Sequence, residues 1–285
     1  MAGINVNTST IALPTDVSDV IIQKMQEESA VMKLATKITL PGLGTTIPVI
    51  TGDPEADWVA ETDKKPVSRP GLSKKVMQAY TLAVIVPFSN QFRDNVPALY
   101  KAIVERLPRA IAQKFDSTVF HGAAPGSNFD TFASATAQSI GSDAYAALVS
   151  ADADIASNGG MTSGFVISAQ GKGQLLRATD TTGRPIFINS VAEGAIPMIL
   201  GNPTVYSKAA YKAVSGGNDI LGIAGDWSQA MYGVAKDFNI SISEQASITD
   251  GDTVLNLWER NMFAVRAEIE VGFVADTSVF NLITE

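Results

Sequence analysis

The sequence has no cysteine and only one histidine, His121, among its 285 residues. The lack of cysteine excludes disulfides, thiolate nucleophiles and cysteine-ligated metal sites. A hydrolase needs a base beside its nucleophile, and a lone histidine does not supply the convergent group of residues that such chemistry requires. His121 falls at the end of a predicted helix, where it is more simply a partner of the negative end of the helix dipole.

The signatures of membrane insertion, export and cofactor binding are also missing. No run of about 18 apolar residues predicts a transmembrane helix, and the first residues lack the basic and apolar regions of a secretory signal. No Walker or dinucleotide glycine motif occurs, because Gly171-Lys172-Gly173 is too short, and no cluster of metal ligands is present. We therefore expect no enzymatic activity, no cofactor, no metal and no membrane partner.

The chain has fewer basic residues than acidic ones, 21 against 29. Its formal net charge of −8 disfavours a nucleic-acid binder that works by neutralising phosphates, but an acidic surface is compatible with enclosing DNA without gripping it. The three tryptophans, Trp58, Trp227 and Trp258, are expected to be packing anchors rather than a platform on which bases stack.

Residues 95–122 carry the helical pattern around which we expect the rest of the chain to be organised. Asn95 is placed to cap this helix and Gly122 to end it. Pro108 lies inside it and is expected to bend or split the helix, because it removes one backbone donor. The apolar side chains recur every three or four residues, which is typical of an amphipathic helix. They are Val96, Leu99, Tyr100, Ile103, Val104, Leu107, Ile111, Phe115 and Val119.

Residues 52–75 separate their charges by sign, which predicts an extended excursion with an acidic limb and a basic limb. The two limbs can attract each other within one hairpin, dock one copy of the chain on the next, or form a solvated surface loop. A calcium site on the acidic limb is a weak alternative, because Trp58 stands where an EF-hand needs glycine. The acidic residues are Asp53, Glu55, Asp57, Glu61 and Asp63, and the basic residues are Lys64, Lys65, Arg69, Lys74 and Lys75.

Two segments have the alternating pattern of long strands. Residues 76–86 predict one strand that leads to the long helix. Residues 262–274 predict the most regular strand, with Phe263 and every second residue after it facing a core, and with Arg266, Glu268 and Glu270 facing solvent or a partner. We expect the long helix to pack on a sheet that contains this strand.

The rest of the chain predicts a mixture of helices and short strands, and hence an α+β fold. One or two helices are expected within residues 14–37, with Ser29 capping the second, and a loop within residues 123–139. Further helices are expected at residues 142–155, capped by Ser142, and at residues 170–178. Short strands are predicted within 38–50 and at 165–167, 185–188, 197–206, 220–224, 230–234, 239–244 and 280–284.

Several motifs, taken together, resemble the major capsid proteins of tailed double-stranded DNA bacteriophages, which have the Hong Kong 97 type fold. No single motif is specific, and the match depends on their order and spacing across about the whole chain, together with the long helix ending at Gly122. The motifs are Trp58-Val59-Ala60-Glu61, Lys65-Pro66-Val67-Ser68, Phe165-Val166-Ile167-Ser168, Leu175-Leu176-Arg177, Asp180 to Pro185, Leu200-Gly201-Asn202-Pro203, Gly225-Asp226-Trp227 and Arg260-Asn261-Met262 through Arg266-Ala267-Glu268.

The resemblance implies a Hong Kong 97 type capsid fold in four parts. These are an N-terminal arm (1–41), an extended β-hairpin loop (42–83), a peripheral domain with the spine helix (84–139 and 251–275) and an axial domain (140–250 and 276–285). The cleavable, scaffold-like N-terminal domain of some members is not expected here, so a separate scaffold protein is expected instead.

The function that the resemblance implies is structural. Such a protein self-assembles as hexamers and pentamers into an icosahedral shell that encloses the phage genome. The implied partners are copies of itself, a scaffold protein, a portal, a decoration protein and double-stranded DNA held without sequence-specific binding; the implied location is the virion capsid, assembled in the host cytoplasm. The alternatives are an encapsulin-like nanocompartment that encloses cargo protein and another virion protein such as a tail tube subunit.

The resemblance also implies a covalent bond between subunits. In some members, a lysine of the extended loop joins an asparagine of a neighbouring subunit with the help of a glutamate, and by motif these residues are Lys65, Asn261 and Glu268. Seven residues of extended strand span ~23 Å, so Asn261 and Glu268 of one chain do not meet unless the strand bends between them. The glutamate otherwise comes from another subunit, or the three residues serve packing and pairing without any bond.

Overall fold

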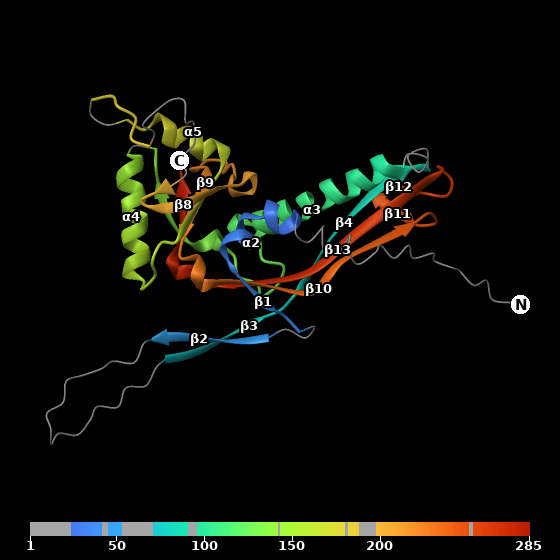
Figure 1. Ribbon diagram of the computed structural model, residues 1–285, viewed down its shortest axis with the longest axis horizontal. Coiled ribbons are helices and arrows are strands. Elements are labelled where there is room, and N and C mark those ends of the chain that lie inside the picture. The colour runs from blue at the N-terminus through green and yellow to red at the C-terminus, as the bar shows by residue number, and fades with distance from the viewer. Residues whose placement is uncertain are drawn as a thin grey trace, which may run out of the picture.

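The computed structural model describes residues 24–41, 45–52, 71–90, 96–141, 143–179, 182–187, 198–250 and 253–285. In Figure 1 these residues form an elongated subunit. A compact unit that contains the C-terminus lies at one end, a long helix and sheet extend from it, and a two-stranded hairpin projects below the compact unit.

The long helix is α3, Val96–His121, as the spacing of apolar residues predicts. Leu107, Ile111, Phe115 and Val119 are buried and belong to one hydrophobic core. Pro108 does not split the helix, which continues through it. The apolar residues on both sides of the proline are held in the core, and this packing offsets the backbone donor that proline lacks.

A four-stranded sheet packs against α3, in the order β1-β10-β13-β4. Its strands are β1 (Thr36–Thr39), β10 (Ala230–Ser243), β13 (Met262–Ala275) and β4 (Tyr80–Ser89). Only β1 runs parallel to its neighbour, β10. The ring centroids of Phe115 on α3 and Phe273 on β13 lie 6.4 Å apart, edge to face. The predicted packing of the long helix on the strand at 262–274 is therefore confirmed.

The prediction of one strand over residues 76–86 is wrong. The chain forms β3 (Gly71–Met77), leaves the strand at Gln78 and Ala79, and then forms β4. β3 pairs with β2 (Thr45–Gly52) in a separate two-stranded sheet. Met77 at the break is fully buried beside Leu40 and Val274. This buried side chain fixes the point at which the chain passes from one sheet to the other.

The compact unit is built on a second sheet of six strands, in the order β5-β14-β9-β6-β8-β7. Its helices are α4 (Ala144–Ser157) and α5 (Ala169–Arg177). The strands are β5 (Thr136–Ser139), β14 (Phe280–Thr284), β9 (Ile220–Gly225), β6 (Gly164–Ile167), β8 (Asn202–Tyr206) and β7 (Met198–Ile199). The short elements that complete the fold are α2 (Ala30–Leu34), β11 (Ser247–Asp250), β12 (Thr253–Asn256) and the 3-10 turns η2 (Phe132–Ser134), η3 (Lys208–Ala210), η4 (Trp227–Gln229) and η5 (Thr277–Val279).

Several local predictions need correction. Residues 136–139 form an edge strand that pairs in parallel with β14, where a loop was expected. The cap of α4 is Asp143, whose carboxylate accepts from the Ala146 amide, and not Ser142. Residues 230–243 form one strand, because pairing with β13 continues through the irregular register between Val234 and Asn239. Pro185 makes only an isolated bridge with Thr179.

The helix α2 is held against α3 by a buried carboxylate. Asp116 of α3 is 1% exposed, and its Oδ2 accepts from the Ala30 amide at 2.7 Å. Its Oδ1 accepts from the Ser29 hydroxyl at 2.5 Å and from the Val31 amide at 3.4 Å. Ser29 also caps α2, as predicted, by accepting from the Met32 amide at 3.1 Å. Burial raises the pKa of the Asp116 carboxyl to about 6, although the three donors and Lys33 favour its ionised form.

We predict that Ile111→Ala lowers the free energy of unfolding by ~2–5 kcal/mol, because Ile111 is 2% exposed and its truncation leaves a cavity between helix and sheet. Lys114→Ala on the exposed side of the same helix is the matched control and should change stability by less than about 0.5 kcal/mol. Chemical denaturation of the unassembled subunit measures both. Equal stability of the two variants would contradict the packing described.

We predict that Asp116 makes the subunit less stable as the pH rises from about 4 to about 6. The pKa is raised in the folded state, so in this interval the folded chain holds a proton that the unfolded chain has released, and stability falls with increasing pH. A rise of roughly two pKa units corresponds to about 3 kcal/mol. Asp116→Asn should remove this part of the pH dependence, measured as the difference between the two unfolding curves across the interval. Parallel curves would contradict the assignment.

Candidate functional site

Eight of the charged residues predicted to contact other subunits lie outside the described residues: Asp53, Glu55, Asp57, Glu61, Asp63, Lys64, Lys65 and Arg69. The weak calcium site and Trp58 fall there too. The structure does describe the root of the excursion, β2 and β3, which Figure 1 shows projecting away from both larger sheets. Lys74 lies in β3. The prediction of a hairpin at this place in the chain agrees with the antiparallel pairing of β2 and β3.

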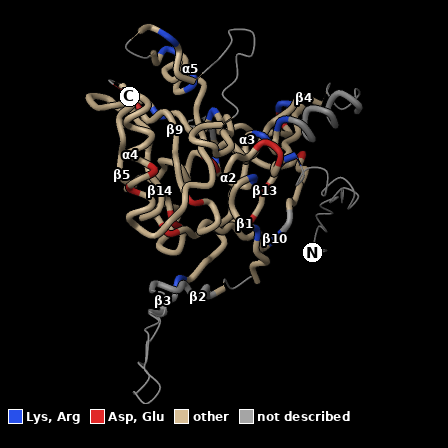
Figure 2. Tube along the Cα trace, turned by 60° about the vertical axis from the view of Figure 1, so that its left-hand side comes forward, with Lys and Arg blue, Asp and Glu red and all other residues tan. Residues whose placement is uncertain are grey.

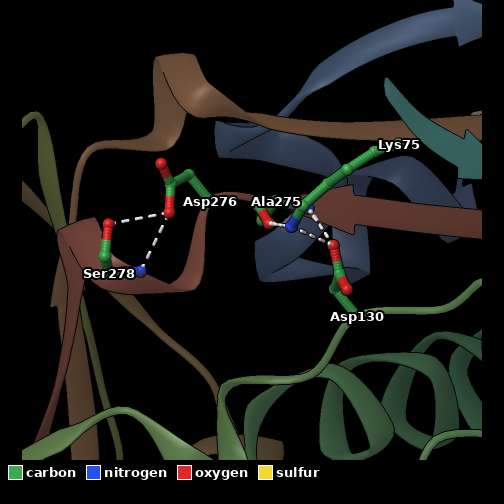
Figure 3. A network of polar contacts seen from close by, with 5 residues as sticks. All are labelled: Lys75, Asp130, Ala275, Asp276 and Ser278. Carbon is green, nitrogen blue, oxygen red and sulfur yellow. Dashed lines mark hydrogen bonds and ion pairs between the residues drawn. The ribbon is translucent and has the colours of Figure 1, made fainter. Parts of the chain in front are cut away.

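Lys75 ties the root of the excursion to its own subunit (Figure 3). Its Nζ lies 2.9 Å from Asp130 Oδ2 and donates to the Ala275 carbonyl at 2.6 Å. The same Asp130 oxygen accepts from the Ala275 amide at 3.1 Å. Both side chains are partly exposed, so the ion pair contributes at most about 1 kcal/mol. Its main effect is positional, because it joins β3 to the end of β13.

Asn261 lies in a tight turn immediately before β13. Its φ is +52°, a left-handed conformation that asparagine tolerates better than most residues. Its carbonyl accepts from the Asn90 amide at 3.0 Å, and its Oδ1 accepts from Asn90 Nδ2 at 2.7 Å. The side-chain carbonyl of Asn261 is therefore held in place by the residue that follows β4.

Glu268 lies in the middle of β13, on a face where charged and polar side chains of β13 meet those of β10. Its Oε1 accepts from Asn239 Nδ2 at 3.2 Å, and its Oε2 lies 3.5 Å from Arg266 Nε. Further along the same pair of strands, Lys236 Nζ lies 2.6 Å from Glu270 Oε1. The charged row predicted for this strand is thus paired within the subunit, partly across to β10 and partly along β13 itself.

The structure does not bring Asn261 and Glu268 of one chain together. β13 pairs with β4 in unbroken register from Met262 to Val271, so there is no bend between the two residues. Seven residues of extended strand separate them by ~23 Å. The sequence left two geometries open for the bond: Asn261 and Glu268 from one chain, or from two different subunits. A straight strand excludes the first.

His121 is held by backbone carbonyls rather than by a nucleophile or an acid. Its Nε2 lies 2.8 Å from the Ala209 carbonyl oxygen, and burial lowers the pKa of the imidazole. Over the ranges that the structure describes, no group of three or more His, Asp or Glu side chains is placed to hold a metal ion. Within those same ranges, no helix is long and apolar enough to cross a membrane.

The prediction that the tryptophans are packing anchors holds for Trp227 and is wrong for Trp258. Trp227 is 2% exposed and donates from its indole nitrogen to the Gly164 carbonyl at 3.1 Å. Trp258 is 71% exposed, and Val254 of β12, four residues before it in the chain, is 61% exposed. Figure 1 shows β12 at the end of the subunit far from the compact unit, and Trp258 follows β12 by two residues. The sequence pattern does not predict that Trp258 and Val254 are exposed. Both residues sit in a short hairpin and the turn after it, without a buried partner strand.

Comparison with known proteins places this geometry in a family. Residues 10–277 match the family described as "Phage capsid family". The chain is similar to "Probable major capsid protein gp17" of Mycobacterium phage L5, with 28% identity over 268 residues that cover 86% of this chain and 80% of the relative.

Solved structures have the same fold. A chain from Gordonia phage Cozz superposes with a TM-score of 0.72 at 24% identity and covers 90% of this chain and 86% of its own length. A chain solved as "Capsid of empty GTA particle computed with C5 symmetry" gives a TM-score of 0.65 at 14% identity, with 90% and 89% covered. The predicted capsid-type α+β fold is confirmed, and with the family match extending over most of its length, the chain belongs to the phage capsid family.

Proposed function

We propose that this chain is the major capsid protein of a tailed bacteriophage, and that its copies assemble as hexamers and pentamers into an icosahedral shell around the genome. The observation that carries this proposal is the match of residues 10–277 to the phage capsid family. The elongated subunit supports it, because a lone monomer has no use for a projecting hairpin (Figure 1) or for a tryptophan, Trp258, that is 71% exposed.

The comparisons favour a phage shell over the encapsulin-like alternative. The curated relative is named as a major capsid protein of a phage, and the structural neighbours are a phage chain and a particle capsid. The membership of a structural family supports a protein without enzymatic activity. Its further partners in this proposal are a scaffold protein, a portal, a decoration protein and double-stranded DNA, and assembly takes place in the host cytoplasm.

The proposed domains of the capsid subunit correspond to the sheets of the structure. The six-stranded sheet with α4 and α5 serves as the axial domain, α3 with the four-stranded sheet serves as the peripheral domain, and the hairpin of β2 and β3 is the root of the extended loop. β10 lies beside β13 in the four-stranded sheet, so residues 230–243 work with the peripheral domain although they fall within the range 140–250 expected for the axial domain.

The content and shape of particles purified from infected cells test this proposal. Electron micrographs should show closed shells of uniform size, with this chain as the main protein and DNA protected from nuclease inside. A cargo enzyme in place of DNA would support the encapsulin-like alternative, and helical tubes would support a tail tube subunit. A purified chain that stays monomeric at high concentration with scaffold supplied would contradict all three.

The extended loop is proposed to lie on a neighbouring subunit, where Lys65 forms a covalent bond with Asn261. A neutral lysine amine attacks the side-chain carbonyl carbon of Asn261, an amide bond forms, and ammonia leaves. Glu268 takes the proton from the attacking amine as general base and then delivers it to the departing NH2 group, which leaves as ammonia. Because Asn261 and Glu268 are far apart along β13, the glutamate comes from a different subunit than the asparagine. The hydrogen bond from Asn90 to Asn261 Oδ1 supports this step, because it polarises the carbonyl that is attacked.

A denaturing gel of mature particles tests the bond. We expect a ladder of multimers in the wild type and a single band near 30.0 kDa in Lys65→Ala and in Asn261→Ala. Lys64→Ala, which removes the neighbouring lysine, is the matched control and should keep the ladder. A single monomer band in the wild type would remove the covalent bond from the proposal and leave the shell held by non-covalent contacts.

A further inference from the structure

The six-stranded sheet presents two different exposed surfaces at its opposite edges. β5 forms one edge and β7 forms the other. The helix α4 packs on β5, β14 and β9, so it covers the half of the sheet that ends at the first edge. Six strands spaced about 4.8 Å apart place the two edges roughly 24 Å from each other.

The first surface is apolar and acidic. Tyr145 is 51% exposed and Val149 is 40% exposed. They are four residues apart on α4, and Asp152, three residues further on, lies on the same side of the helix and is partly buried. No lysine or arginine occurs between Lys114 and Lys172 in the sequence, so this part of the chain has no lysine or arginine of its own to neutralise its acidic side chains. We call Tyr145, Val149 and Asp152 the α4 face.

The second surface is apolar and basic. Met198 of β7 is 62% exposed, and Leu200 in the turn after it is 39% exposed. Lys172 of α5 reaches over Tyr206 of β8, with its Nζ 5.3 Å from the ring centroid, and Lys208 beyond β8 is exposed. We call these five residues the β7–β8 edge. In Figure 2 basic residues gather around α5 and acidic residues around α4 and β14, which is the same separation seen across the whole compact unit.

We propose that the α4 face of one subunit docks on the β7–β8 edge of the next copy of the chain, with Asp152 facing Lys172. This inference rests on the proposed function and names the surfaces by which the compact units meet. Each surface combines exposed apolar side chains with charge, and the two charges have opposite sign, so each surface fits the other better than it fits itself. A two-fold contact of α4 with α4 would instead place the two Asp152 carboxylates together.

The docking is head to tail, because the two surfaces are different parts of the chain at opposite edges of one sheet. Such heterologous contacts generate rings when the rotation from one copy to the next closes. The same pair of surfaces therefore serves every subunit of a ring, and no subunit is left with an unfilled face.

Two charge reversals and their combination test the pairing. Asp152→Lys places a lysine against Lys172 of the neighbour, and Lys172→Glu places a glutamate against Asp152, so each variant alone should raise the concentration needed for assembly by roughly tenfold or more. The chain that carries both substitutions has the two charges exchanged and should assemble as the wild type does. Sedimentation gives the fraction assembled, and electron microscopy gives the shape of the product.

A mixture of the two single variants makes a sharper test. In a 1:1 mixture each subunit finds a complementary charge on a neighbour of the other kind, at both of its edges. Assembly should return, but only in rings with an even number of subunits, because the two kinds must alternate. Hexameric rings should therefore recover while pentamers do not.

Glu27→Lys is the matched control, because it changes the net charge by the same amount at an exposed residue outside both surfaces. It should leave assembly unchanged within about twofold, and thermal unfolding of each unassembled variant should match the wild type. Single variants that assemble as well as the wild type, or a mixture that stays unassembled, would overturn the docking while leaving the proposed function intact. A wild type that never assembles would overturn the proposed function itself.

Discussion

A single aromatic core joins the two large sheets, and the shape of the subunit depends on it. Phe132 stacks on Phe280 of β14 with ring centroids 4.2 Å apart. It also meets Phe273 of β13 at 5.6 Å and Trp227 at 5.9 Å, both edge to face. Phe120 of α3 contacts Trp227 at 6.5 Å. These rings come from both sheets and from the long helix, so the two halves of the subunit share one desolvated core and cannot be separated without exposing it.

Elements with a strong period were predictable from the sequence. The apolar positions of α3 and the alternation of β13 specify their buried faces directly, because each pattern places the apolar side chains on a single face of the element. The capping of α2 by Ser29 followed from residue chemistry at a helix start. The motif order was enough to identify the fold, which the family match over residues 10–277 confirms.

The failures arise where partners distant in sequence decide the structure. β5 is four polar and small residues, and it is a strand only because β14 offers an unpaired edge, with Thr136 of β5 paired to Asn281 of β14. The break after Met77 depends on a pocket made by Leu40 and Val274. The pairing of Glu268 with Asn239 and the contact of Asn90 with Asn261 depend on strand register, which the sequence alone does not give. For the same reason the exposure of Trp258 could not be predicted.

The passage from β13 to β14 has a mechanical consequence. β13 ends at Ala275 in one sheet and β14 begins at Phe280 in the other, with only Asp276 and the turn η5 between them. β13 has 14 residues, so it is a beam roughly 46 Å long that is clamped near this junction by Lys75 and Asp130. A load applied at its far end, near Trp258, is therefore carried as leverage to the junction between the two sheets, where this short link and the shared aromatic core resist it together. The stiffness of that junction therefore limits how far the two halves of the subunit can bend relative to each other.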